Sequence, residues 1–272
     1  MNINLSGVQE TLLIPLWSRA KFAKENNSIL IDPIAVDIVK QIQYDFNKID
    51  KYFPYFLHLQ NLVRTKMLDN TIREFLINHP NATIINLGAG LDTTFFRIDN
   101  GLLNWYDIDL PEVIEIRNKL IPRSGRLNYV KGSIFEMKWV KDIASTKDGI
   151  LFMSNGVIEY FDERVVKKFL SDIADNFPES EIVFNTIRKN IVTSYFNRRM
   201  MKRLGMESAT TKWGIKDPRK IERWDKRFVV IESYPLFSKI KTQKNWDLNH
   251  IKAMNRFDKW KAVNIVHLKF ME

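Results

Sequence analysis

The chain has 272 residues, a net charge of +10, 45% hydrophobic residues and no cysteine. A hydrophobic content of this size suits a globular protein with a sizeable core, built as one large domain or two small ones. The lack of cysteine excludes disulfides, thiolate metal sites and cysteine nucleophiles.

The positive charge is concentrated in the last third of the chain. Residues 188–272 hold 21 Lys and Arg against 8 Asp and Glu, whereas residues 1–187 carry a net charge of −3. This pattern indicates either an anionic partner, such as nucleic acid or a membrane surface, or only a solvated lysine-rich face.

The four histidines lie far apart, so we expect no metal site. With no secretion signal and no apolar run of about 18 residues, we expect a cytoplasmic protein that does not cross a membrane.

The N-terminal part of the chain predicts helices that precede a sheet. Residues 11–23 predict a short helix or two, broken near Pro15. A proline directly after Asp32 opens the next helix, and residues 50–76 predict a longer one with an apolar face. We expect this helical region, residues 1–80, to cover a ligand pocket.

The centre of the chain is Ile84–Arg97, where a buried strand ends in a G-x-G turn at Gly88 and Gly90 and a helix follows. Glycines let a ligand approach the backbone closely, and a helix N-terminus offers free N–H groups. Many such turns serve only tight packing. A second strand, however, ends at Asp107 and Asp109, and an acidic residue at this distance is where nucleotide-binding folds hold a ribose hydroxyl pair.

The turn lacks the third glycine of the dinucleotide pattern. Leu91 and Thr94 occupy the nearby positions. A pyrophosphate needs the close helix approach that the third glycine allows, so the turn favours a ligand with a ribose but no phosphates. S-adenosylmethionine is the candidate that fits this description.

The remaining elements complete an alternating α/β pattern. Further strands are predicted at residues 126–130, 149–154, 182–185, 227–233 and 262–270, with helices at 112–120, 162–176, 188–204 and 217–225. The helix over 188–204 is amphipathic and basic. We expect one domain, residues 1–272, made of a helical cover (1–80), a cofactor-binding core (81–187), a basic helical insertion (188–226) and C-terminal strands (227–272).

Three motifs carry a resemblance to a known family. They are N-L-G-A-G-L-D-T, W-Y-D-I-D-L-P-E-V-I and L-F-M-S-N-G-V-I-E-Y-F. With them, essentially the whole chain resembles the leucine carboxyl methyltransferase family, and more narrowly its bacterial branch with polyketide-biosynthesis O-methyltransferases of the tetracenomycin type. The resemblance implies the α/β fold of class I S-adenosylmethionine-dependent methyltransferases: a Rossmann-like seven-stranded sheet, N-terminal helices and a helical insertion after the fifth strand.

The resemblance also implies residues of the site. Arg64 matches the arginine that holds the cofactor's methionine carboxylate, a role that suits a bidentate guanidinium, although the sequence pattern alone favours a surface arginine. Lys21 matches a second carboxylate-binding residue, and Ser133 and Ile134 match the adenine contacts. Asn155 stands where many members carry a glutamate. The predicted cofactor-binding residues are Lys21, Arg64, Gly88, Ala89, Gly90, Asp107, Asp109, Ser133, Ile134 and Asn155.

These features predict an S-adenosylmethionine-dependent O-methyltransferase that acts on a carboxylate or hydroxyl of a small molecule, in polyketide or other secondary metabolism. A carboxylate acceptor needs no general base and a hydroxyl would benefit from one, but the sequence identifies no catalytic residue. Tyr160 either lines the acceptor side with Asn155 or belongs to the core. The alternatives are a nucleic-acid or protein methyltransferase that uses the basic last third, and a cofactor-binding protein without activity.

Overall fold

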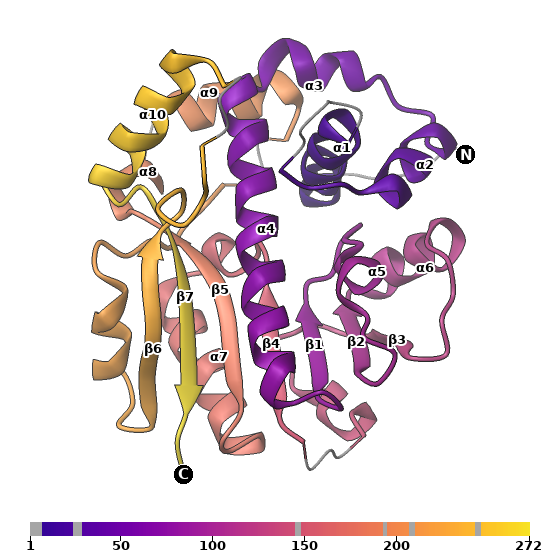
Figure 1. The fold of residues 1–272 in the computed structure, drawn as a ribbon, viewed down its shortest axis with the longest axis vertical. Helices are drawn as coiled ribbons and strands as arrows, with labels where there is room; N and C mark the ends of the chain where they lie inside the picture. Colours follow the sequence, from indigo (N-terminus) through magenta and orange to yellow (C-terminus); the bar gives the residue numbers. More distant parts are fainter. Residues whose placement is uncertain (1–6, 24–28, 145–147, 193–194, 207–209, 243–245) are drawn as a thin grey trace.

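The molecule is organised around a seven-stranded sheet with the strand order β3-β2-β1-β4-β5-β7-β6 (Figure 1). A computed structural model describes residues 7–23, 29–144, 148–192, 195–206, 210–242 and 246–272. The strands are β1 (Thr83–Leu87), β2 (Asn104–Asp109), β3 (Leu127–Lys131), β4 (Ile150–Ser154), β5 (Glu181–Ile187), β6 (Phe228–Pro235) and β7 (Val263–Phe270). Strands β1 to β5 are parallel, and β7 lies antiparallel between β5 and β6. The predicted class I methyltransferase sheet is thereby confirmed.

The central strands are buried on both faces. All five residues of β1 are buried, as expected for a parallel strand that helices cover on either side. Because successive side chains of a strand point to opposite faces, Ile84 packs in the apolar cluster of α4 (Tyr55–Asn78), whereas Ile85 packs in the cluster of α7 (Glu163–Asn176). Figure 1 shows these two helices on opposite faces of the sheet.

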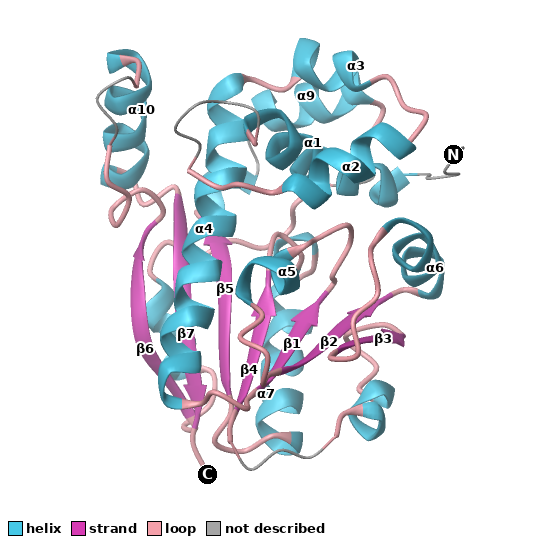
Figure 2. Cartoon of the chain, turned by 45° about the vertical axis from the view of Figure 1, so that its right-hand side comes forward, coloured by secondary structure: helices cyan, strands magenta, loops and turns pink. Residues whose placement is uncertain are grey.

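A third apolar cluster lies above the carboxyl ends of the parallel strands. It joins α1 (Leu13–Phe22), α2 (Pro33–Gln41) and α3 (Phe46–Tyr52) to α9 (Tyr195–Leu204), a helix from the distant insertion. Figure 2 shows these four helices together beyond the strand ends. The other elements are η1 (Gly7–Leu12), α5 (Thr94–Ile98), α6 (Pro111–Leu120), η2 (Lys138–Asp142), η3 (Ile158–Tyr160), α8 (Lys189–Val192), η4 (Pro218–Arg223) and α10 (Leu248–Lys259).

Two prolines lie at the starts of helices. The helix expected over residues 50–76 is two helices, α3 and α4, because Pro54 is the N-cap of α4 and its predecessor Phe53 is extended. The break expected near Pro15 lies just before it, between Leu12 and Leu13, where η1 ends and α1 begins. Pro15 lies in the first turn of α1, where a backbone N–H would lack an intrahelical partner in any case.

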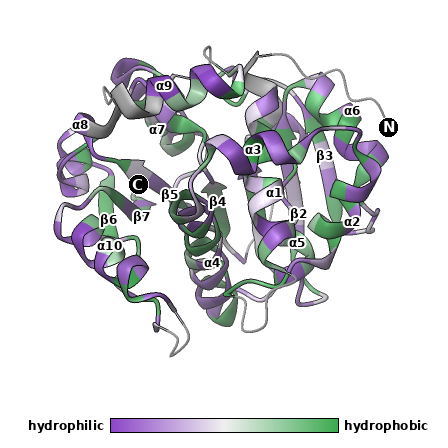
Figure 3. Ribbon diagram, turned by 90° about the horizontal axis from the view of Figure 1, so that it is seen from above, coloured by the Kyte–Doolittle hydropathy of each residue, from purple (hydrophilic) through white to green (hydrophobic). Residues whose placement is uncertain are grey.

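The basic insertion also differs from the single helix expected over residues 188–204. It forms α8 and α9, and residues 193–194 between them lie outside the described residues. The helix expected over 217–225 is the shorter 3-10 helix η4. Figure 3 shows hydrophilic stretches in α3 and α9. In α9, Met200 and Leu204 are buried while Arg199 and Arg203 are exposed. No helix in the described ranges combines the length and apolarity needed to cross a bilayer.

Candidate active site

The glycine turn between β1 and α5 packs closely against the neighbouring strand end and the loop after β4. Gly88 and Gly90 have φ angles of +70° and +49°, which a residue with a Cβ adopts only under strain. The N–H groups of Gly88 and Ala89 donate to the carbonyl of Ile108 at 2.9 and 3.2 Å. A Cβ on Gly88 would also lie 2.7 Å from the side chain of Val157. The predicted turn therefore has no room for a larger residue at this position.

The glycine turn is held by a buried arginine, Arg117, that was not predicted from the sequence as part of the site. Arg117 on α6 is 2% exposed, and its Nη1 donates to the carbonyls of Ala89, Gly90 and Asp92 at 3.2, 2.8 and 3.0 Å. Its Nη2 forms an ion pair with Asp107. One guanidinium thus donates to three carbonyls of the turn, of which that of Ala89 also accepts the backbone N–H of Asp92 at 2.9 Å.

The structure gives Asp107 a different environment from the predicted cofactor site. Its carboxylate is 1% exposed and accepts hydrogen bonds from Asn86 Nδ2 at 2.9 Å and Trp105 Nε1 at 2.8 Å, besides the Arg117 ion pair. It does not line the cavity described below. Asp107 instead anchors Arg117, so its contribution to the site is to support the turn.

Asp109 lies at the end of β2, where the ribose-binding acid was expected. Its Oδ2 accepts the N–H of Gly90 at 2.7 Å, and Oδ1 accepts the N–H of Leu110 at 2.7 Å. Each carboxylate oxygen retains a lone pair for a further donor. The assignment of Asp109 to a ribose stays a prediction, as do those of Ser133 and Ile134, and none of the three lines the cavity.

A cavity of about 770 Å³ lies between the strand ends and the helical cover. Its walls come from the glycine turn, α1, α4, the loop after β4, α9 and the start of β7. Five of the predicted residues line it: Arg64, Gly88, Ala89, Gly90 and Asn155. The volume is within the range of enclosed ligand sites, and the position above the carboxyl ends of parallel strands is where such sheets bind ligands.

Arg64 is the charged centre of this cavity. It is 9% exposed, and its Nε has no hydrogen-bond partner among the described residues. Burial lowers the pKa of its guanidinium, while the nearby Glu159 opposes that shift. No carboxylate in the described part of the chain lies within 4.0 Å of it in an ion pair. A buried cation in this state suits the carboxylate of a ligand.

Arg19 lines the cavity, where the sequence predicts Lys21. The Nζ of Lys21 donates to Asp50 at 2.8 Å, and the side chain does not line the cavity. Arg19, which lies two residues earlier on α1, does line it. Its guanidinium pairs with Asp32 at 2.9 Å and donates to the carbonyl of Leu91 at 2.7 Å. The structure thus places Arg19, rather than Lys21, against the glycine turn.

Arg19 belongs to a buried charge network that joins the cover to the sheet. Asp32 accepts from Arg19, from Thr93 at 2.5 Å and from Arg97 at 2.9 Å. Arg97 also donates to Asp69 on α4 at 2.8 Å. Flanking charges on both sides keep the pKa of Asp32 below its usual range, although burial acts in the opposite direction.

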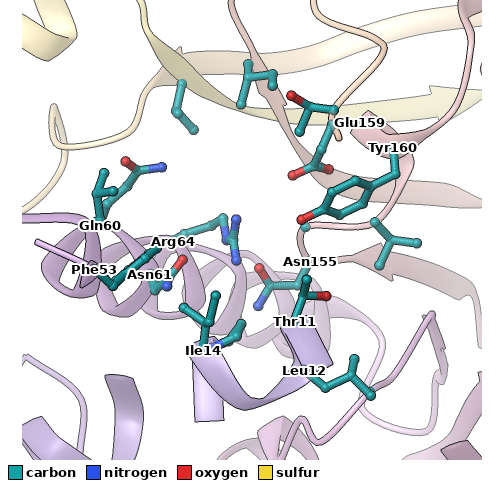
Figure 4. A pocket seen from close by; sticks show the side chains of 18 of the residues that line it. Thr11, Leu12, Ile14, Phe53, Gln60, Asn61, Arg64, Asn155, Glu159 and Tyr160 are labelled. Atoms are coloured by element: carbon teal, nitrogen blue, oxygen red, sulfur yellow. The ribbon is translucent and has the colours of Figure 1, made fainter. Parts of the chain in front are cut away.

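The loop after β4 brings three polar side chains to the cavity. In Figure 4, Asn155, Glu159 and Tyr160 point toward the space beside Arg64. Asn155 donates from Nδ2 to Thr65 Oγ1 at 3.3 Å, and its buried Oδ1 has no partner among the described residues. Glu159 was not a predicted site residue, since a single glutamate in a short apolar run gives no sign of its direction.

Asn155 should contribute to ligand binding more than to folding. We expect Asn155→Ala to weaken S-adenosylmethionine binding by about 1–3 kcal/mol, because a polar group of the ligand loses its partner. Melting curves with and without the ligand measure this effect as a smaller ligand-induced shift. Asn176→Ala is the control, at an exposed asparagine of α7 whose Nδ2 donates to the carbonyl of Asp172 at 2.7 Å. An unchanged shift with a lower midpoint of the ligand-free protein would make Asn155 structural.

The basic helix α9 contributes to the rim of the cavity. Arg198 and Lys202 line it together with Met200 and Met201. Arg203 stacks on the ring of Tyr52 from α3, with its Cζ 5.9 Å from the ring centroid. Part of the basic charge thus packs the insertion onto the cover, and part faces the ligand space. Among the described residues, no three His, Asp or Glu side chains are grouped to hold a metal ion.

Comparison with known proteins agrees with this geometry. The family model of leucine carboxyl methyltransferase matches residues 13–174. The tetracenomycin polyketide synthesis O-methyltransferase TcmP of Streptomyces glaucescens is 26% identical over 256 residues, which cover 90% of each chain. The S-adenosyl-L-methionine-dependent methyltransferase dpfgK of Gibberella zeae is 28% identical over 259 residues, which cover 85% of each chain.

Solved structures share the fold at much lower identity. A DUF574 family protein from Streptomyces avermitilis has a TM-score of 0.59 at 8% identity, covering 93% of this chain and 97% of that one. The plantazolicin methyltransferase BpumL in complex with SAH has a TM-score of 0.51 at 12% identity, covering 97% and 99%. At this identity the likeness concerns the arrangement of strands and helices alone.

Proposed function

This chain belongs to the leucine carboxyl methyltransferase family and is an S-adenosylmethionine-dependent methyltransferase, and we propose that its reaction is the O-methylation of a small molecule. The observation that carries this proposal is the covered cavity of about 770 Å³. The glycine turn and Arg64 line one part of it, and apolar side chains line another part, the apolar compartment. That compartment is lined by Phe56, Ile187, Phe257 and Val263. Helices of the cover and the insertion enclose it, which favours a compact acceptor over a polymer.

The cofactor supplies a methyl group on a sulfonium, so the protein's task is alignment and exclusion of water. Arg64 would hold the methionine carboxylate, and the buried Oδ1 of Asn155 is available to accept a hydrogen bond from the neighbouring ammonium. The glycine turn and Asp109 would hold the adenosine end. The relative TcmP is named for polyketide synthesis, and dpfgK is named for its dependence on S-adenosylmethionine. We therefore propose that this chain acts in polyketide or related secondary metabolism, in the cytoplasm.

Two measurements test the proposal. In the first, calorimetry should give micromolar binding of S-adenosylmethionine and no binding of NAD, because the turn lacks the third glycine that a pyrophosphate requires. In the second, the enzyme and tritium-labelled S-adenosylmethionine are incubated with cell extract, which is then separated into small molecules, nucleic acid and protein. We expect label in the small-molecule fraction, in a product that base hydrolysis and mass spectrometry identify as a methyl ester or ether.

Other outcomes identify the alternatives. Label in nucleic acid or protein, lost in a variant with Arg198 and Lys202 changed to glutamate, would assign the basic rim to a macromolecular acceptor. Micromolar S-adenosylmethionine binding without label in any fraction would make the protein a binder without activity.

A further inference from the structure

Glu159 is a buried carboxylate in the wall of the cavity. It lies in η3, which residues 155–157 connect to β4, and is 4% exposed. Its Oε1 accepts from Asn185 Nδ2 at 3.2 Å, whereas its Oε2 has no hydrogen-bond partner among the described residues. Glu159 lines the cavity, and Figure 4 shows its carboxylate directed into the space between Arg64 and Tyr160.

Burial of such a group without a full set of partners is costly, so its surroundings indicate a purpose beyond folding. Desolvation raises the pKa of Glu159, and the positive charge of Arg64 limits that rise. The pKa of the adjacent Tyr160 is raised to about 12, chiefly by burial and also by the charge of Glu159. The tyrosine therefore keeps its proton, and the carboxylate is the basic group of this part of the cavity.

Asn185 on β5 sets the direction of Glu159. Its Nδ2 donates to Glu159, and its Oδ1 accepts the N–H of Gly156 at 2.8 Å. Gly156 in turn packs against Arg64, since a Cβ there would lie 2.9 Å from Nη2. The carboxylate is thus held by the same strand end that holds the arginine, which gives it the rigidity that a proton acceptor needs.

We propose that Glu159 is the general base of the reaction and that the acceptor is therefore a hydroxyl group, of a phenol or an alcohol, and not a carboxylate. This inference rests on the proposed function and narrows it. An ionised acceptor carboxylate would meet the like charge of Glu159 in a buried space, where such repulsion is strong. A hydroxyl instead donates a hydrogen bond to Oε2, the atom that lacks a partner.

The proposed step is balanced in atoms and electrons. The hydroxyl proton passes to Oε2 of Glu159 as the acceptor oxygen forms its bond to the methyl carbon. The carbon–sulfur bond breaks, and its electron pair stays on sulfur to give S-adenosylhomocysteine. The carboxyl group later loses the proton to solvent, which restores the base.

The position of this carboxylate gives a reason for the asparagine at position 155. The family resemblance places a glutamate at Asn155 in many members, and here a carboxylate enters the same cavity four residues later. If Glu159 served only as a counter-charge for the cofactor, its loss would weaken cofactor binding. If it is the base, its loss would reduce turnover and leave cofactor binding nearly unchanged, and this difference separates the two roles.

The test uses acceptors matched in shape, 4-methylphenol with 4-methylbenzoate and 2-naphthol with 2-naphthoate, and labelled S-adenosylmethionine. We expect transfer to the phenols to exceed transfer to the acids, and Glu159→Gln to lower kcat for the phenols by about 100-fold or more. The Kd of S-adenosylmethionine should change less than threefold. Glu181→Gln, at a carboxylate outside the cavity that bonds to His267 at 2.6 Å, should leave kcat unchanged.

Two further readouts report the proton directly. The rise of kcat with pH in the wild type should disappear in Glu159→Gln, because neither group facing this carboxylate titrates near neutral pH. Arg64 from α4 stays protonated as arginines do, and the pKa of Tyr160 in the same turn is raised to about 12. The absorbance of 4-nitrophenol bound to the S-adenosylhomocysteine complex measures its ionisation without turnover. Loss of the neighbouring negative charge in Glu159→Gln should shift that ionisation to lower pH.

Each contrary outcome has a separate meaning. Faster transfer to the acids, or unchanged kcat for the phenols in Glu159→Gln, would overturn the role of Glu159. A parallel loss of cofactor affinity and kcat would make Glu159 a counter-charge and not a base. No transfer to any of these acceptors or to extract, with cofactor binding intact, would contradict the proposed function itself and the base with it.

Discussion

Arg117→Met should lower the free energy of unfolding by about 3–5 kcal/mol, because it leaves Asp107 as an unpaired buried charge. The same change removes the donor to three carbonyls of the glycine turn, so S-adenosylmethionine binding should be lost as well. Urea unfolding measures the first effect and calorimetry the second. The stability deficit should shrink at low pH, since without its partner Asp107 has a raised pKa and folds more favourably when protonated.

The control is an ion pair of the same chemistry at the surface. Arg126 pairs with Asp99, and their side chains are 38% and 21% exposed. Arg126→Met should therefore cost no more than about 1 kcal/mol. The double variant Arg117→Met with Asp107→Asn should recover part of the lost stability because it removes the unpaired charge. Equal losses of unfolding free energy in Arg117→Met and Arg126→Met would show that the buried ion pair stabilises the protein no more than the surface pair.

Arg64→Met should weaken S-adenosylmethionine binding by about 2–4 kcal/mol, or about 30- to 1,000-fold in Kd, because the ligand carboxylate loses its buried partner. The free energy of unfolding of the ligand-free protein should change by less than this, since the guanidinium forms no ion pair in the described structure and its charge only limits the rise in the pKa of the nearby Glu159. A large loss of affinity in calorimetry beside a small change in thermal melting is the mark of a residue kept for its ligand.

Arg73→Met on the same helix is the matched control. Arg73 is exposed and donates to the carbonyl of Arg97 at 2.8 Å. We expect its replacement to leave the Kd within a factor of two. An unchanged Kd in Arg64→Met, with folding intact by circular dichroism, would show that the methionine carboxylate is held elsewhere.

The sheet could be predicted from the sequence because its signals are local. Each central strand is a short apolar run, and the strand–glycine–helix pattern at Gly88 and Gly90 fixes the place of the turn. The parallel order then puts the ends of β1 and β4 side by side, so Gly88 and Asn155 meet in one cavity.

Prediction from the sequence missed site residues whose role depends on the direction in which the side chain points. The periodicity of the sequence alone does not give this direction. Arg19 and Lys21 are both basic and two residues apart, and at 3.6 residues per turn they lie on nearly opposite sides of α1. Only one of them can face inward, and Arg19 is the one that does, with a hydrogen bond from its Nη2 to the carbonyl of Leu91. Arg117 reads as one more charged residue of an amphipathic helix, and Glu159 lies in a 3-10 turn without a repeat long enough to orient it.

The charge network around Asp32 has a consequence for how the molecule opens. To lift α1 and α2 from the sheet, solvent would have to reach Arg19, Asp32, Arg97 and Asp69 together, since each is held by another member of the network. Partial opening would leave an isolated charge inside, so the helices are released together with the core or not at all. Amide hydrogens of α1 and α2 should then exchange with deuterium at rates close to those of β1.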